Sequence, residues 1–338
     1  MEDRTKKKRT MKDRYAEYRK NLIWILIEFL VVFYILCRIV YIPWNTVMSA
    51  VSGRVSSIFS YIMQNYTGAI PYIFVLFLWT WYIRPNRYIW KSFLLPKKSA
   101  AASEEDRKAD FYGRSRNSFR MLAWGFLIGF LMNGFTIACA LIHGDIKLYF
   151  ESSLREIPML LFALVSVLIQ SSAEELWCRG FLYERIHERY PLWAAILVNG
   201  VLFGVMHLLN EGAAVLSVAE IAVSGVAYSL FRWYSGNIWS IMGVHTAWNF
   251  TQAFLFGLPN SGLVSELSLF HLSASNGVSN LIYDFTFGVE GCLPAFITDL
   301  AVIVIVIILA ARNGRLKELG MNCDRTMNRM KSEVGKQA

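Results

Sequence analysis

The sequence predicts an all-α protein, a polytopic integral membrane bundle of about eight transmembrane helices. Apolar residues make up 55% of its 338 residues and charged residues only 17%, whereas soluble domains carry roughly a quarter charged residues. Several windows reach the length of about 20 mostly apolar residues that a membrane-spanning helix needs. The net charge of +9 gathers in stretches that adjoin these windows.

Eight apolar segments are predicted to span the bilayer. They are Leu22 to Trp44, Ala69 to Ile83, Met121 to Ile142, Ile157 into the Glu174 region, Leu192 to Leu209, Ala213 to Trp233, Asn237 to Leu258, and Leu293 to Ala311. The second is short and extends backwards through Tyr61 to Tyr66 if the helix is longer. We expect the fourth to continue as one long helix through Arg189, because nothing breaks it before Pro191.

The basic residues predict the topology. They concentrate at Lys6 to Lys20, Arg84 to Arg120 and Arg312 to Lys336, and Lys and Arg near the ends of spans stay in the cytoplasm. An even number of spans places all three clusters on that side, with both termini cytoplasmic, most simply in the plasma membrane. Because each cluster adjoins an apolar span, we expect the lipid bilayer and no nucleic acid as the partner.

The predicted organisation has four parts. Residues 1–21 form a basic amino terminus, 22–120 two spans and a basic cytoplasmic loop, 121–311 a membrane domain with its core at 157–258, and 312–338 a basic tail. The segment from Asn260 to Gly291 is a long external loop rich in Ser, Gly and Asn. Such a loop is either a lid or a disordered connector, and the sequence does not choose between the two.

The fourth span contains two adjacent carboxylates and an arginine, and ionisable groups inside spans mark function by default. Glu175 and Arg179 are four residues apart with the acid first, which favours a helical ion pair. Glu174 projects about 100° away around the helix, where it is free to face a cavity. The alternative is that these charges merely mark the cytoplasmic end of the helix.

Two further spans carry polar pairs at a spacing of four, Phe203 with His207 and His245 with Asn249. Either histidine alone is compatible with packing, and the second pair with an interhelical polar clamp of about 1 kcal/mol. Together with Glu174, however, the spans offer a carboxylate, imidazoles and an amide donor. Those groups can activate water and stabilise an oxyanion, as hydrolysis of a peptide bond requires.

This pattern resembles the CAAX-processing and bacteriocin-processing family of membrane proteases, known as CPBP or ABI. The family has three short motifs in this order, and the matching residues are Glu174, Glu175 and Arg179, then Phe203 and His207, then His245 and Asn249. Each motif is weak alone, but the three in order on successive spans are a specific combination. The resemblance covers about Ile157 to Leu258.

The resemblance implies the role of each residue. Glu174 is expected to activate water with the help of His207, and His245 with Asn249 to stabilise the oxyanion. The remaining motif residues are expected to support the site: Glu175, Arg179 and Phe203. The geometry of a helix separates Glu174 from Glu175 independently of the resemblance.

A divalent metal such as zinc is an open question, with Glu174, His207 and His245 as the candidate ligands. Members of the family are commonly labelled metalloproteases, yet no span holds the His-Glu-x-x-His pattern of zincins, and a metal-free glutamate mechanism uses the same residues. We therefore expect no firmly bound cofactor. His207 is predicted near the outer end of its span and Glu174 nearer the inner side. Contact between them is therefore a prediction that needs a long or tilted fourth helix and a displaced fifth.

The expected function is that of an intramembrane endopeptidase, a hydrolase that cleaves a leader or secreted peptide, or a lipidated or membrane-associated protein. A non-catalytic immunity or scaffold protein of the same fold is the alternative. A small transporter is less favoured because the sequence has no internal repeat. Two other ionisable residues are expected away from the site, His187 on a solvated face and Asp299 at the membrane interface.

Overall fold

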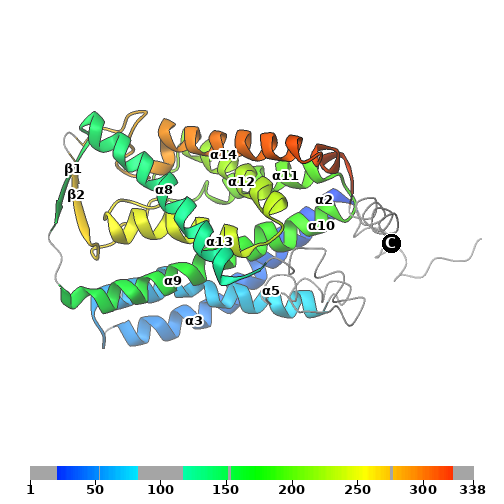
Figure 1. Ribbon diagram of the computed structural model, residues 1–338. Helices are drawn as coiled ribbons and strands as arrows, with labels where there is room; N and C mark the ends of the chain where they lie inside the picture. Colours follow the sequence, from blue (N-terminus) through cyan, green and yellow to red (C-terminus); the bar gives the residue numbers. More distant parts are fainter. Residues whose placement is uncertain (1–20, 53, 83–116, 151–153, 275–276, 323–338) are drawn as a thin grey trace, which may run out of the picture.

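The computed structural model describes residues 21–52, 54–82, 117–150, 154–274 and 277–322, which form a bundle of helices (Figure 1). All eight predicted spans are helical within these residues. The amino-terminal half contains α2 (Leu22–Leu30), η1 (Val31–Leu36), α3 (Cys37–Ser52), α4 (Ser57–Asn65), η2 (Thr67–Ala69), α5 (Ile70–Tyr82), α8 (Phe119–His143) and β1 (Ile146–Phe150). There follow η4 (Leu154–Glu156), α9 (Ile157–Glu175), η5 (Leu176–Leu182), α10 (Tyr183–His187), α11 (Leu192–Met206), α12 (Val215–Ser235), α13 (Trp239–Phe250), η6 (Thr251–Leu255), β2 (Phe270–Ala274), η7 (Val289–Gly291), α14 (Leu293–Arg312) and η8 (Leu316–Gly320).

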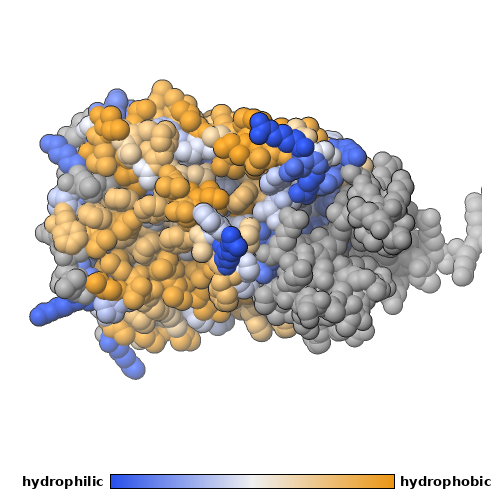
Figure 2. All heavy atoms as spheres, in the orientation of Figure 1, coloured by the Kyte–Doolittle hydropathy of each residue, from blue (hydrophilic) through white to orange (hydrophobic). Residues whose placement is uncertain are grey.

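The surface of the bundle is apolar. Five helical segments of the described chain are long and apolar enough to cross a membrane, namely Leu22–Val51, Phe119–His143, Ile157–His187, Val215–Ser235 and Leu293–Arg312. Large apolar side chains such as Ile142 and Val215 are 88% and 90% exposed, and Figure 2 shows hydrophobic residues over most of one face. An apolar surface of this kind is stable in contact with the lipid chains of a bilayer. The protein is therefore an integral membrane protein.

Helices α8 and α13 touch through their backbones. A Cβ atom on Gly125 would lie 1.9 Å from the carbonyl oxygen of Ser240, and one on Gly129 would lie 2.2 Å from that of Val244. Gly243 meets α8 equally closely from the other side. Small residues four apart let membrane helices approach in this way. As a result, α13 is buried in the middle of the bundle.

The fourth predicted span is a continuous helical segment from Ile157 to His187, through α9, η5 and α10. The expected continuation past Glu174 is therefore confirmed. The charged residues of the first motif lie inside this segment, so the alternative that they mark the end of a helix is wrong. Helix α11, by contrast, is short and ends at Met206.

The first helix begins and the last helix ends at the same end of the bundle. The Leu22 N–H donates to the Tyr190 hydroxyl at 2.9 Å, and Trp233 Nε1 donates to Glu318 at 3.0 Å. The β1–β2 pair lies at the opposite end (Figure 1). An even number of spans produces this arrangement. Most of the predicted basic clusters, at 1–20, 83–116 and 323–338, lies outside the described residues.

The long loop before α14 packs against the bundle over the residues that are described. Its strand β2 pairs antiparallel with β1, with Phe270 opposite Phe150, and its last turn, η7, is buried. These described parts are therefore not a disordered connector.

Two of the predicted positions are wrong. His187 is 6% exposed and Asp299 is 1% exposed, whereas a solvated face and an interface were expected. His187 is buried because α10 continues α9 and packs against α11. Asp299 is buried because α14 begins at Leu293, so that this residue lies inside the helix where α14 packs against α12.

The contact between α8 and α13 is open to a direct test. Gly129→Ile places a branched side chain against the α13 backbone, and we expect a loss of about 1–3 kcal/mol in the free energy of unfolding. Gly134→Ala is the matched control, because a Cβ on Gly134 of the same helix meets nothing within 4 Å. The melting temperature in detergent should fall for the first variant and hold for the second; equal melting temperatures would contradict the packing described.

Candidate active site

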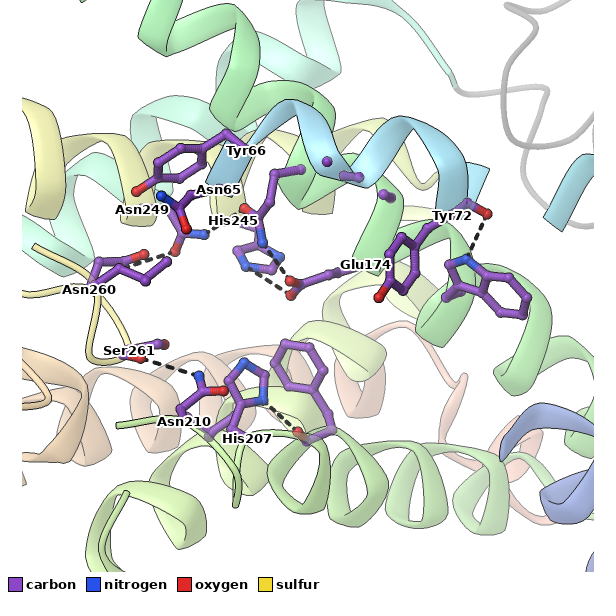
Figure 3. Close-up of a pocket in the computed structure, with 18 of the residues that line it drawn as sticks. Asn65, Tyr66, Tyr72, Glu174, His207, Asn210, His245, Asn249, Asn260 and Ser261 are labelled. Carbon is purple, nitrogen blue, oxygen red and sulfur yellow. Dashed lines mark hydrogen bonds and ion pairs between the residues drawn. The ribbon is translucent and has the colours of Figure 1, made fainter. Parts of the chain in front are cut away.

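One cavity inside the bundle contains all four predicted catalytic residues. Its volume is about 470 Å³, within the range of roughly 300–1,000 Å³ typical of ligand sites. Glu174 enters it from α9, His207 from the turn after α11, and His245 and Asn249 from α13 (Figure 3). Three motifs far apart in the sequence therefore converge in space.

The two glutamates of the first motif have different surroundings. Glu175 Oε1 accepts a hydrogen bond of 3.0 Å from Arg179 Nη1, and both side chains are completely buried. The predicted ion pair is thus formed. Glu174 instead lines the cavity, and its side chain is 25% exposed. The helix becomes π-helical directly after Glu175, a feature that is frequent at functional sites.

His245 lies between the two glutamates. Its Nδ1 is 2.8 Å from Glu175 Oε1, and its Nε2 is 3.7 Å from Glu174 Oε2. Because a carboxylate only accepts hydrogen bonds, the proton of the Nδ1 contact belongs to the ring. That bond orients the imidazole, and it directs Nε2 towards Glu174 and the cavity.

His207 faces the cavity from the other side. Its Nδ1 is 2.8 Å from the carbonyl oxygen of Phe203, so Nδ1 is the donor, and Nε2 of the neutral ring is an acceptor. Figure 3 shows the ring across the cavity from Glu174. Glu174 and His207 therefore line the same cavity, as the predicted contact requires, but no hydrogen bond joins their side chains. Both line the cavity because the segment that carries Glu174 continues to His187, while α11 ends at Met206.

Phe203 separates the two histidines and covers the arginine. Its ring centroid is 4.9 Å from that of His207 and 6.1 Å from that of His245. The Arg179 guanidinium carbon lies 4.0 Å from the same ring centre, a cation–π contact. The aromatic side chain thereby joins the second motif to the other two.

Two amide side chains that the sequence analysis missed complete the wall around Glu174. Gln170 Nε2 donates to Glu174 Oε1 at 2.5 Å, and its Oε1 accepts from Asn249 Nδ2 at 3.1 Å. Asn260 Nδ2 in turn donates to Asn249 Oδ1 at 3.3 Å. Gln170 precedes Glu174 by one helical turn, and a polar residue at that place in an apolar segment could have indicated a role at the site. Asn260 lies among other polar residues of a loop, so no sequence pattern distinguishes it.

The loop also supplies a buried acid. Glu290 accepts hydrogen bonds from Trp248 Nε1, Asn260 Nδ2, and both the N–H and the hydroxyl of Ser261, at 2.5–3.1 Å. Burial raises the pKa of the Glu290 carboxyl to about 7, although the bonds from Ser261 and Trp248 lower it in part. No sequence pattern indicated this residue.

The candidate metal ligands do not form a cage. Within the part of the chain that the structure describes, no three His, Cys, Asp or Glu side chains are arranged to hold a metal ion. His245 Nδ1 is occupied by Glu175, and His207 lies across the cavity from Glu174. The donor set therefore does not match the tetrahedral sites of zinc enzymes.

Comparison with known proteins finds matches over the segment that carries this cavity. Residues 156–251, which include all seven motif residues, match the family described as type II CAAX prenyl endopeptidase Rce1-like. The chain is 32% identical over 169 residues to the uncharacterized protein YyaK of Bacillus subtilis (strain 168), a match covering 48% of this chain and 56% of that protein. The chain thus spans about half the length of this relative. No solved structure matches it. The resemblance predicted from the motifs is confirmed for this segment.

Replacement of Glu175 should lower the free energy of unfolding more than replacement of Glu174. Glu175→Ala leaves the Arg179 charge buried and unpaired, which typically costs about 3–5 kcal/mol. Glu174→Ala removes one hydrogen bond at a cavity wall, which costs about 1 kcal/mol. Thermal unfolding in detergent should therefore show a large fall for the first variant and a small one for the second. The reverse order would contradict the assignment of Glu175 as the structural partner.

Proposed function

We propose that this Rce1-like membrane protein is an endopeptidase that hydrolyses a peptide bond with water activated by Glu174. The observation that carries the proposal is the placement of Glu174, His207, His245 and Asn249 around one cavity inside an apolar bundle. A carboxylate base facing imidazole and amide groups is the set of groups that hydrolysis of a peptide bond requires.

The first step is attack by water. The Glu174 carboxylate takes one proton from a water molecule, and Nε2 of neutral His207 accepts a hydrogen bond from the remaining O–H, which stays on the attacking oxygen. The oxygen bonds to the carbonyl carbon of the substrate, and the electron pair of the carbonyl moves to its oxygen. Asn249 Nδ2 and the Nε2–H of protonated His245 donate to that oxyanion. The oxyanion electron pair then re-forms the carbonyl, the carbon–nitrogen bond breaks with its pair on nitrogen, and Glu174 returns its proton to that leaving amine.

His245 is held for this role by its neighbours. Its Nδ1–H is bound to Glu175 at 2.8 Å, and Glu174 lies 3.7 Å from Nε2. Two carboxylates around one imidazole stabilise a positive charge on the ring. A cationic donor is worth more to a developing oxyanion than a neutral one.

The substrate is a peptide or a lipidated or membrane-associated protein that reaches the cavity from the bilayer, and a leader or secreted peptide of the bacteriocin type fits equally. Aromatic side chains, among them Phe33, Tyr41 and Tyr72, line one part of the cavity and suit an apolar segment. In this proposal the protein resides in the plasma membrane, with both termini cytoplasmic.

Activity of purified protein in liposomes tests the proposal. The probes are internally quenched peptides, with and without a lipidated cysteine near the carboxyl end. We expect Glu174→Ala to lower the rate about 10²–10⁴-fold and His245→Ala about 10²–10³-fold. Glu266→Ala, at an exposed glutamate of the loop, is the control. If Glu174→Ala and His245→Ala both cleave the peptides at the rate of the parent protein, the protease proposal fails. A non-catalytic scaffold or immunity role would then be favoured.

Chelation tests the metal-free chemistry separately. Since the residues around the cavity form no zinc cage, we expect cleavage to persist after extended dialysis against a strong chelator such as 1,10-phenanthroline. Metal content is measured on the same sample by mass spectrometry. Loss of activity that zinc alone restores would overturn a mechanism driven by Glu174 without metal.

A further inference from the structure

A chain of hydrogen bonds connects the loop before α14 to the glutamate in the cavity. Asn260 Nδ2 donates to Glu290 Oε1 at 3.0 Å and to Asn249 Oδ1 at 3.3 Å. Asn249 Nδ2 donates to Gln170 Oε1 at 3.1 Å, and Gln170 Nε2 donates to Glu174 Oε1 at 2.5 Å. The chain therefore has a carboxyl group at each end and three amides between them.

The order of donors and acceptors along this chain leaves each amide a single orientation. An amide has one oxygen that accepts and one NH₂ group that donates. With Glu290 accepting, the NH₂ group of Asn260 faces it and also faces the oxygen of Asn249. The NH₂ group of Asn249 then faces the oxygen of Gln170, whose own NH₂ group faces Glu174. Reversal of any one amide would set two donors or two acceptors against each other.

We propose that Gln170 and Asn260, which lie outside the three motifs, are positioning residues of this active site. Gln170 holds the carboxylate of Glu174, and Asn260 decides that the NH₂ group of Asn249 is turned towards Gln170 and the cavity. One hydrogen of that NH₂ group binds Gln170 at 3.1 Å, and the group also lies 3.5 Å from the Ser171 hydroxyl oxygen, a long contact that a substrate oxygen would displace. Glu290 anchors the chain at its outer end. The inference rests on the proposed function, in which Glu174 and Asn249 act on the substrate.

A comparator is needed because the loss of any buried amide lowers stability. Asn133 of α8 provides it, since its Nδ2 donates to Gln252 Oε1 at 3.0 Å in a buried amide pair, and Gln252 in turn donates to the carbonyl oxygen of Pro259 and not to an amide of the chain described above. Asn133→Leu and Gln170→Leu each remove a buried amide hydrogen bond between helices. Only the second should alter the site.

The first measurement is the division between kcat and KM for a peptide that the parent protein cleaves. We expect Gln170→Leu to lower kcat about 10- to 100-fold, the usual effect of a misplaced catalytic group, with KM nearly unchanged. Gln170→Glu keeps the shape but replaces the donor with an acceptor, and it should be equally harmful. Asn133→Leu should lower the melting temperature and keep kcat.

Asn260 is tested in combination with Gln170. Asn260→Ala alone should lower kcat about tenfold, because the side-chain amide of Asn249 can then rotate and exchange the places of its oxygen and its NH₂ group. Both residues belong to the same chain of hydrogen bonds. The fold-decrease in kcat of the double variant Gln170→Leu/Asn260→Ala should therefore be smaller than the product of the two single fold-decreases. Multiplicative losses would show that the two residues act independently and would contradict the proposed chain.

A second measurement does not depend on activity. Dicyclohexylcarbodiimide modifies protonated carboxyl groups in apolar surroundings, and mass spectrometry locates the modified residue. Because Gln170 Nε2 is the donor that occupies Glu174 Oε1, Gln170→Leu should free this oxygen and increase labelling of Glu174 about tenfold, while Asn133→Leu leaves it unchanged. Glu28, which is paired with Arg185, serves as the internal reference.

The outcomes separate the two proposals. If Gln170→Leu lowers the melting temperature as Asn133→Leu does, yet changes neither kcat nor Glu174 labelling, Gln170 is only structural and the inference is overturned. If the parent cleaves no peptide while Glu174 labelling still responds to Gln170→Leu, the proposed function fails and the positioning of Glu174 stands.

Discussion

The buried ion pair between Glu175 and Arg179 is the interaction on which the rest of the site depends. Both side chains are completely buried, and a charge in such a place is tolerated only when it is paired. Both residues of the pair also contact residues of the other two motifs. Glu175 orients His245 through Nδ1, and the Arg179 guanidinium covers the ring of Phe203. A single buried contact on one helix therefore connects all three motifs.

Helix lengths and close backbone contacts then set the depth of each group. The glycine contacts between α8 and α13 bring the helix that carries His245 into the centre of the bundle. The continuous segment from Ile157 to His187 carries Glu174 to the same level, and the early end of α11 at Met206 leaves His207 in a turn beside the cavity. The helix packing that stabilises the bundle also forms the cavity.

The loop before α14 belongs to the site as much as to the surface. It contributes Asn260, Ser261 and Glu290 to the wall of the cavity, and through Asn260 it contacts the amide of Asn249. Polar groups removed from water need partners, and here those partners come from the loop on one side and from Gln170 on the other. The loop and the cavity wall that carries Glu174 are consequently one hydrogen-bonded unit.

The sequence alone determined the membrane class, the eight helical segments and the different surroundings of Glu174 and Glu175, because apolar length and helical period are local properties. It also predicted the residues that meet in the cavity, through motifs at fixed spacing. Tertiary structure alone decided which histidine lies nearest Glu174, that His187 and Asp299 are buried, and that Gln170, Asn260 and Glu290 join the site. Those facts depend on where helices end and which faces meet, and contacts between distant segments leave no periodic signal in the chain.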